Sequence, residues 1–295
     1  MPNFISEDQI EQALLQRLQH LCGFDVLECH TADPADLNDG SGRSDKREVL
    51  LPARLKAAAL RLNPQIPEPV VETALARLAD RRQAMSLVAA NREVDGLLRD
   101  GVPVSYEDAQ GKSKQELLKL IDFSAEGVRR NEFLAVSQLW IKCTGPTALA
   151  DYRRPDVLLY VNGIPLVFVE LKNSNVKLKT AYSDNLTNYK QDIPQLFIPN
   201  AFCVLSNAVE TRLGSLTGQW EHFFGWLRVH DEKEKIDRAQ IAEARHQPGA
   251  AGGGPVPAGA AAGLCGKFRA VPLRDEQDPG AEPPVHRREP CAEAV

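Results

Sequence analysis

The sequence of 295 residues lacks long apolar runs and closely paired cysteines. No stretch approaches the roughly 18–20 consecutive apolar residues that a membrane-spanning helix needs. The N-terminus, MPNFISEDQI, has neither the basic start nor the apolar core of a signal peptide. The six cysteines contain no CxxC pair, which argues against a structural zinc site. We therefore expect no membrane partner and a cytoplasmic location.

Net positive charge is also missing. The formal charge is −5 at pH 7, which argues against a protein that grips nucleic acid tightly on its own. This net charge does not exclude a local basic channel, or partner proteins that bind the nucleic acid. The composition is otherwise that of a globular protein, with 43% hydrophobic and 25% charged residues. The length suits one large domain or two small ones.

Hydrophobic periodicity predicts an α/β fold. Residues 6–22 have the pattern of an amphipathic helix, and Ser6 with Gln9 forms a capping box at its start. Helical patterning also dominates from about Glu48 to Asp100. Strands are predicted at 133–142, 156–161, 165–171 and 202–206, and short helices at 177–189 and 219–226. Helices and strands arranged around one hairpin indicate an α/β domain.

The segment RRPDVLLYVNGIPLVFVELK, residues 153–172, contains two apolar strands separated by Asn162-Gly163. Asn-Gly is the strongest short hairpin signal. The segment carries Asp156 at one end and Glu170 and Lys172 at the other. Charges at the end of an apolar strand are costly to bury unless something pairs with them. They therefore either lie at the margin of the sheet, with an incidental salt bridge, or serve a chemical purpose.

The register of the hairpin decides whether the two carboxylates meet. A three-residue loop, 162–164, places Asp156 opposite Glu170, with Cβ atoms about 4.5–5.5 Å apart. We predict this register, because a two-residue loop would place Val169 there instead. Two opposed carboxylates suit Mg2+, which keeps several waters and accepts phosphate oxygens. Lys172 shares the face of Glu170, because side chains alternate along a strand, and can position water or stabilise an anionic transition state.

The pattern Pro155-Asp156 … Glu170-Leu171-Lys172 matches the PD-(D/E)xK nuclease motif. Its context resembles the N-terminal nuclease domain of the restriction (R) subunit of type I restriction–modification enzymes. The resembling stretches are RNEFLAVSQLWI, RRPDVLLYVNGIPLVFVELK, NLTNYKQDIPQLFIPNAFCVLSNA and LGSLTGQWEHFFGW. The resemblance implies a PD-(D/E)xK restriction-endonuclease-like core over residues 1–240. This core is a mixed central sheet flanked by helices, with a helical insert at about 40–130.

The resemblance also implies residue roles at the centre of the site. Asp156 and Glu170 would bind the metal, and Lys172 would be catalytic. A glutamate of the first helix often joins such a site. Glu11 is the best match and Glu7 is the reserve candidate. The alternative for Glu11 is a solvated glutamate on the helix surface.

A Gln-x-x-x-Tyr motif often follows the lysine in this family. Here Asn185 and Tyr189 match its spacing, with Asn where Gln is usual. Asn185 has the same amide with one methylene less reach, so it could still contact DNA or the lysine. Tyr189 reads equally well as an aromatic residue that packs the helix.

The function implied by the resemblance is that of a type I site-specific deoxyribonuclease. The domain would cleave double-stranded DNA with Mg2+, inside a complex with methylation (M) and specificity (S) subunits. ATP would belong to the motor of a full-length R subunit, because this chain has no GxxxxGK[ST] phosphate loop. The chain would then be truncated. Two alternatives are a truncated docking fragment that does not cleave, and a free-standing DNA-repair nuclease of the same fold.

The composition changes abruptly near Arg245. Gly and Pro make up 16 of the last 50 residues, a proportion typical of disorder, so we expect a disordered tail at 245–295. Back-translation of DPGAEPPVHRRE, read one base later, gives ILAQNHQFIGV, and GKFRAVP shifts to ENFVLY. Both resemble the stretch where the family's chain runs from nuclease toward motor. We hypothesise a frameshift near Arg245, and the alternative is a genuine Gly/Pro-rich linker.

Overall fold

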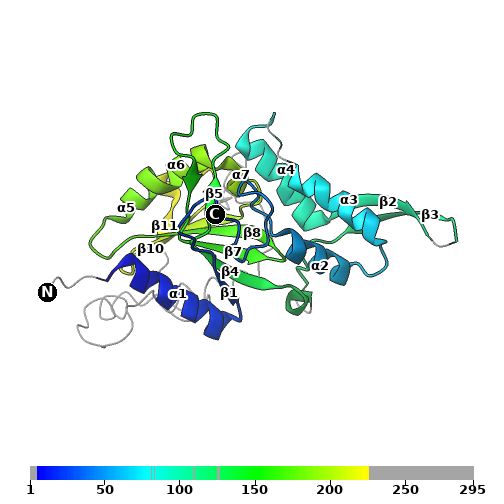
Figure 1. Ribbon diagram of the computed structural model, residues 1–295, viewed down its shortest axis with the longest axis horizontal. Coiled ribbons are helices and arrows are strands. Elements are labelled where there is room, and N and C mark those ends of the chain that lie inside the picture. Colours follow the sequence, from blue (N-terminus) through cyan, green and yellow to red (C-terminus); the bar gives the residue numbers. More distant parts are fainter. Residues whose placement is uncertain (1–4, 81, 83, 109, 125–126, 226–295) are drawn as a thin grey trace, which may run out of the picture.

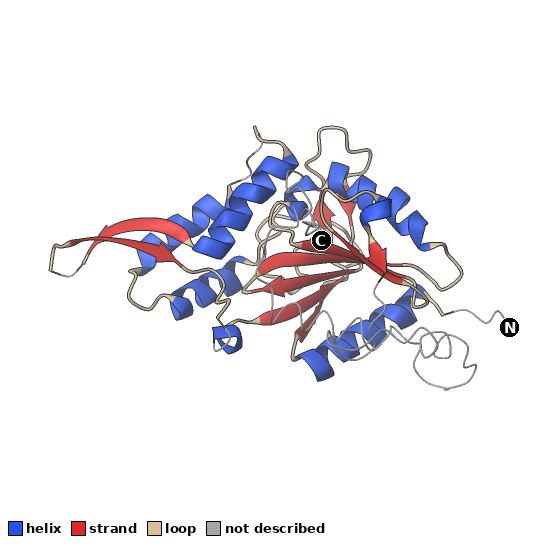
Figure 2. Ribbon diagram, turned by 180° about the vertical axis from the view of Figure 1, so that it is seen from behind, coloured by secondary structure: helices blue, strands red, loops and turns tan. Residues whose placement is uncertain are grey.

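The computed structural model describes residues 5–225, apart from 81, 83, 109 and 125–126. The tail at 245–295 and the frameshift hypothesis therefore lie outside the described residues. The centre is a seven-stranded mixed sheet flanked by helices (Figures 1 and 2). In spatial order its strands are β1 (Asp25–Glu28), β4 (Phe133–Ser137), β7 (Val157–Val161), β8 (Ile164–Leu171), β9 (Phe202–Ser206), β10 (Thr211–Gly214) and β11 (Phe224–Gly225). The β1–β4 and β8–β9 pairs are parallel, and the other neighbouring pairs are antiparallel.

The two faces of the sheet bury separate apolar clusters. Val157 and Leu159 of β7 belong to the cluster that contains α1 and the helices between β1 and β4. Leu158 and Tyr160 belong to the cluster on the other face, which contains the helical segments after β8. The first group is α1 (Glu7–Cys22), α2 (Pro52–Leu62), α3 (Glu68–Ala79) and α4 (Leu87–Asp100). The second is α5 (Leu178–Thr180), a π-helical segment (Ala181–Leu186), α6 (Thr187–Asp192) and α7 (Pro194–Phe197).

The first helix starts where the sequence predicts. The Ser6 hydroxyl accepts the backbone N–H of Gln9, and the Gln9 side chain accepts the backbone N–H of Ser6. This reciprocal pair satisfies two donors that the first turn would otherwise leave open. The helix ends at Gly23, whose φ of 70° forms a left-handed cap. The predicted capping box is therefore confirmed.

The segment between β1 and β4 contains more than helices. Besides α2, α3 and α4 it forms a hairpin of β2 (Val102–Glu107) and β3 (Ser113–Leu118), which the helical prediction missed. Figures 1 and 2 show this hairpin projecting from the sheet at the end away from α1. Its base is nevertheless buried, because Val102 and Leu118 belong to the same apolar cluster as β7 and β8. The segment thus shares the core of the sheet.

The turn between β7 and β8 differs from the predicted three-residue loop. Val161 pairs with Ile164, so the loop has two residues, Asn162 and Gly163. Their φ angles are 53° and 78°, as in the type I′ turn that Asn-Gly favours. Gly163 has no room for a side chain, because an added Cβ would lie 2.8 Å from the carbonyl oxygen of Leu51. The packing of this turn against the start of α2 therefore selects the tighter loop.

A β-bulge then restores the register that the two-residue loop shifts. Tyr160 pairs with Pro165, but Leu159 pairs with Val167, so Leu166 is the extra residue in β8. From there the pairing runs in the predicted register to the end of β7. The next step outward brings Asp156 beside Glu170.

Two other predicted elements are only partly strand or helix. The predicted strand 133–142 is interrupted after Ser137, because Gln138 turns the chain with a φ of 54°. Strand structure resumes at β5 (Ile141–Lys142), which pairs with β6 (Tyr152–Arg153) in a separate two-stranded sheet. The predicted helix 219–226 is a three-residue 3-10 turn followed by β11, and residue 226 lies outside the described part. Phe223 packs its ring directly over Gly214 of β10, which draws the chain onto the sheet instead. Within the described ranges, no helix combines the length and apolar character that a bilayer crossing requires.

Candidate functional site

Asp156 and Glu170 meet at the open end of the β7–β8 hairpin. Asp156 directly precedes β7, and its Oδ2 accepts the backbone N–H of Leu171 at 2.7 Å. This bond fixes the carboxylate against the strand that carries Glu170. Burial raises the pKa of Asp156 to about 6. Burial, together with the charge of Asp156, raises the pKa of Glu170 well above its usual value. Two neighbouring carboxyl groups, of which Glu170 is buried and Asp156 is partly buried, favour either a shared proton or a bound cation.

The two oxygens of Glu170 have different surroundings. The residue is 1% exposed. Its Oε1 accepts hydrogen bonds from Lys172 Nζ at 3.1 Å and from Asn185 Nδ2 at 2.5 Å. Its Oε2 is buried and has no partner among the residues that the structure describes. A buried carboxylate oxygen without a partner is destabilising, so this atom marks a position where a cation would be stabilising.

Lys172 lies on the same face as Glu170, as the alternation of side chains predicts. Its Nζ donates to the Leu171 carbonyl oxygen at 3.0 Å and lies 4.0 Å from Glu7 Oε1. Burial acts to lower the pKa of Lys172, but the neighbouring carboxylates, Glu170 first, outweigh it and raise the pKa. Lys172 is therefore held as a cation, which suits stabilisation of negative charge better than removal of a proton.

Both glutamates of α1 reach this region. Glu11 is 6% exposed, and its Oε2 accepts a hydrogen bond from Gln138 Nε2 at 2.5 Å. Burial raises the pKa of Glu11 to about 7, and the charge of Asp156 adds to that effect. Glu7 accepts the backbone N–H of Asn173 at 3.3 Å and approaches Lys172. Glu11 thus faces inward near the aspartate, whereas Glu7 lies beside the lysine.

Asn185 and Tyr189 lie over the same face of the sheet as Glu170. Asn185 contacts Glu170 through its amide, as described above. Tyr189 is 7% exposed and packs edge-on against Phe168, with ring centroids 5.5 Å apart. Its hydroxyl donates to the carbonyl oxygen of Arg154 at 3.2 Å. Tyr189 therefore packs the helix and also fixes the backbone two residues before Asp156.

Two residues that sequence reasoning did not single out border the carboxylate pair. The backbone N–H of Gln138 donates to the Asp156 carbonyl oxygen at 2.9 Å, while its side chain binds Glu11. The positive charge of Arg154 lowers the pKa of Asp156 against the larger effect of burial. No local pattern marks Gln138, because its contacts join distant segments. Arg154 did have a signal, since it belongs to a pair of arginines directly before the motif.

The site offers two carboxylates and no complete cage for a metal. Among the described residues, no three His, Cys, Asp or Glu side chains converge on one point that could hold a metal ion. Mg2+ does not need such a cage, because it keeps several waters and binds through one or two carboxylates and substrate phosphates. The free Glu170 Oε2 beside Asp156 fits a cation of this kind. The donor set is therefore compatible with Mg2+.

Comparison with known proteins places this geometry in context. Residues 4–222 match the family model described as type I restriction enzyme R protein N terminus. The chain is 37% identical over 238 residues to the type I restriction enzyme HindI endonuclease subunit of Haemophilus influenzae, covering 79% of this chain and 21% of that protein. It is 30% identical over 238 residues to the putative type I restriction enzyme MjaIXP endonuclease subunit of Methanocaldococcus jannaschii, covering 78% and 21%. The chain thus spans about a fifth of the length of these curated relatives.

Proposed function

The chain belongs to the family of the type I restriction enzyme R protein N terminus, and we propose that it is a Mg2+-dependent nuclease domain with the PD-(D/E)xK fold. The substrate is double-stranded DNA, and the reaction is hydrolysis of a phosphodiester bond. One observation carries the proposal. Glu170 Oε2 is buried without a partner among the described residues, beside a second carboxylate and a lysine that is held as a cation.

In such a reaction the residues of the site would each have a separate role. Asp156 and Glu170 would hold the metal, which supplies Lewis-acid neutralisation of the charge on the phosphodiester. Lys172 places a positive charge where negative charge develops on the phosphate. Glu11, with a pKa of about 7, can hold or release a proton at its carboxylate near neutral pH. Gln138 orients Glu11 through its amide and Asp156 through its backbone N–H.

The proposed setting is a larger complex in the cytoplasm. The relatives are named endonuclease subunits, and the chain corresponds to about a fifth of their length. In the proposal, M and S subunits select the DNA, and ATP is used only by the motor of a full-length R subunit. This domain then needs no sequence readout of its own, which agrees with a formal charge of −5.

The test is plasmid cleavage with Mg2+, by the chain alone and with the motor, M and S subunits added. Asp156→Ala, Glu170→Ala and Lys172→Ala should each abolish cleavage by the reconstituted enzyme. Calorimetric titration with Mg2+ should show weaker binding for the two carboxylate variants, because each removes an oxygen ligand. Lys119→Ala is the matched control for the lysine variant, since Lys119 directly follows β3 and its side chain is exposed.

Each outcome selects one function. Unchanged cleavage by a variant would remove that residue from the site. Mg2+ binding without cleavage in the reconstituted enzyme would favour a docking fragment that does not cut. Efficient cleavage by the chain alone would favour a free-standing nuclease.

A further inference from the structure

Arg154 and Trp140 form a stacked pair beside the candidate site. The Arg154 guanidinium carbon lies 4.9 Å from the centroid of the Trp140 ring, and Arg154 precedes Asp156 by two residues. Stacking occupies one face of the planar guanidinium and leaves its N–H edge open to an acceptor. Within the described part of the chain, the Arg154 side chain has neither a hydrogen bond nor an ion pair.

Two other arginines in this region have internal acceptors, which makes Arg154 different. Arg153 pairs with Asp192, with Nη2 and Oδ2 2.5 Å apart. Arg43 donates to Asp39 and to the carbonyl oxygens of Glu48 and Trp140. These side chains hold the fold together by internal contacts. Arg154 is half-buried and its charge acts on Asp156, yet its N–H edge takes no acceptor among the described residues, so that edge is available to a ligand.

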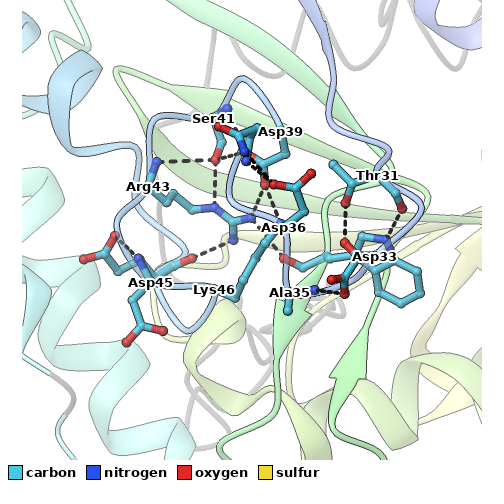
Figure 3. A network of polar contacts seen from close by, with 12 residues as sticks. Thr31, Asp33, Ala35, Asp36, Asp39, Ser41, Arg43, Asp45 and Lys46 are labelled. Atoms are coloured by element: carbon cyan, nitrogen blue, oxygen red, sulfur yellow. Dashed lines mark hydrogen bonds and ion pairs between the residues drawn. The ribbon is translucent and has the colours of Figure 1, made fainter.

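The stacked pair is held in place by its neighbours. The indole Nε1 of Trp140 donates to the Thr31 carbonyl oxygen at 3.1 Å, and the Trp140 carbonyl accepts from Arg43 Nη2 at 3.0 Å. Arg43 belongs to a buried network with Asp39 and Lys46 (Figure 3). The loop that carries this network thus fixes the ring on which Arg154 rests. A preorganised guanidinium loses little conformational freedom when it binds an anion.

We propose that Arg154, held on Trp140, binds a DNA phosphate and so positions the strand to be cut at Asp156 and Glu170. The inference rests on the proposed function. Two carboxylates repel a phosphodiester, and a fixed cation whose charge already acts on Asp156 offsets that repulsion during approach. The guanidinium edge matches two phosphate oxygens at once. Such a contact positions the backbone of the DNA without reading its sequence.

The test measures duplex binding by the whole 295-residue chain. A fluorescein-labelled duplex is titrated by anisotropy over a series of NaCl concentrations, with EDTA present so that cleavage is excluded. Arg154→Gln should weaken binding several-fold and reduce the slope of log K against log[salt] by about one, because one phosphate contact is lost. Arg92→Gln is the matched control, since Arg92 is exposed on α4, and its slope should stay unchanged.

Arg154→Lys separates charge from shape. A lysine keeps the charge but lacks the planar fork, so the salt slope should be kept while the affinity falls. Melting curves of each variant show whether it is folded. If Arg154→Gln fails to fold, the duplex affinity of Arg154→Lys serves as the test.

The outcomes distinguish this inference from the proposed function. An unchanged slope for Arg154→Gln in a chain that cleaves DNA overturns the phosphate contact and leaves the nuclease function standing. A reduced slope in a chain that never cleaves, even in the reconstituted enzyme, supports the contact and overturns the nuclease. Failure of the unsubstituted chain to bind duplex at low salt overturns the contact.

Discussion

Asn185 donates its side-chain amide to Glu170, with Nδ2 and Oε1 2.5 Å apart. The π-helical segment 181–186 carries Asn185. Such wide turns are rare and occur frequently at functional sites. With Lys172 on the same oxygen, Asn185 leaves Glu170 Oε2 as the atom directed at a ligand. Its contact is thus with the glutamate, although the sequence suggested DNA or the lysine.

Asn185→Leu should reduce cleavage by the reconstituted enzyme and weaken Mg2+ binding by about 10- to 100-fold, the usual effect of losing a partner that orients a ligand. Leucine has a similar volume but no donor, so Glu170 Oε1 keeps Lys172 alone. Asn188→Leu is the control, because Asn188 lies one turn further along and donates to the backbone carbonyl of Asp184. Equal cleavage by the Asn185 and Asn188 variants would show that the amide contact has no role.

The metal-free chain should lose stability as the pH rises from about 4 to about 8. Asp156 and Glu11 have folded-state pKa values raised by burial, to about 6 and about 7. An acid with a raised pKa binds its proton more tightly when folded. Its contribution is fully present below the unfolded value near 4 and is lost as the pH rises through the folded value.

Melting temperatures at a series of pH values, with EDTA, measure this loss. Asp156→Asn and Glu11→Gln should each flatten the curve, because neither amide must ionise. Asp100→Asn, at an exposed position, should follow the unsubstituted chain. At pH 8, Mg2+ should raise the melting temperature of the unsubstituted chain more than that of Asp156→Asn. A flat curve for the unsubstituted chain would contradict the buried-acid description.

The sequence predicted the meeting of Asp156 and Glu170, but through the wrong turn. The predicted three-residue loop and the observed two-residue loop with a bulge at Leu166 give the same register at the far end. Nothing in the sequence marks that bulge, because every residue of β8 is apolar and buried on both faces up to Glu170. Alternation then carries no information about which side chain faces which layer.

Tertiary contacts account for what the sequence could not show. Gln138 joins Glu11 to Asp156 only because α1 packs on the sheet, where it contacts β1 and β8. The hairpin β2–β3 was missed because the segment of β3, SKQELL, is polar except at its end. It is held by the burial of Leu118 against the shared core, and sequence periodicity does not report such packing.

Gly163→Ala should destabilise the chain by about 2–4 kcal/mol, the sum of backbone strain and overpacking. Part of this cost is the positive φ, about 1 kcal/mol for a non-glycine residue, and the rest is the clash with the backbone of α2. An added Cβ would lie 2.8 Å from both the Leu51 carbonyl oxygen and the Leu55 nitrogen. Gly111→Ala is a matched control, because its φ of 74° is similar and no atom lies within 4 Å of its added Cβ. Urea unfolding of both variants separates the two terms, and equal losses would mean that the turn does not press on α2.

Asp39→Ala should lower the free energy of unfolding far more than the loss of a more exposed ion pair in the same loop. The reason is that Asp39 belongs to a buried network with Arg43 and Lys46 (Figure 3). Asp39 Oδ2 lies 2.8 Å from both Arg43 Nη2 and Lys46 Nζ, with almost no exposed side-chain surface. Removing the carboxylate leaves two buried cations unpaired, at a cost of about 3–5 kcal/mol. Asp45→Ala breaks the pair with Arg47, whose side chain is 43% exposed, and should cost about 0–1 kcal/mol.

Urea unfolding measures the free energy of unfolding of both variants. Because Arg43 also donates to the carbonyl oxygen of Trp140, the intrinsic fluorescence of the folded Asp39→Ala chain should shift as well. A loss below 1 kcal/mol for Asp39→Ala would mean that water reaches these cations and that the loop does not hold the stacked ring.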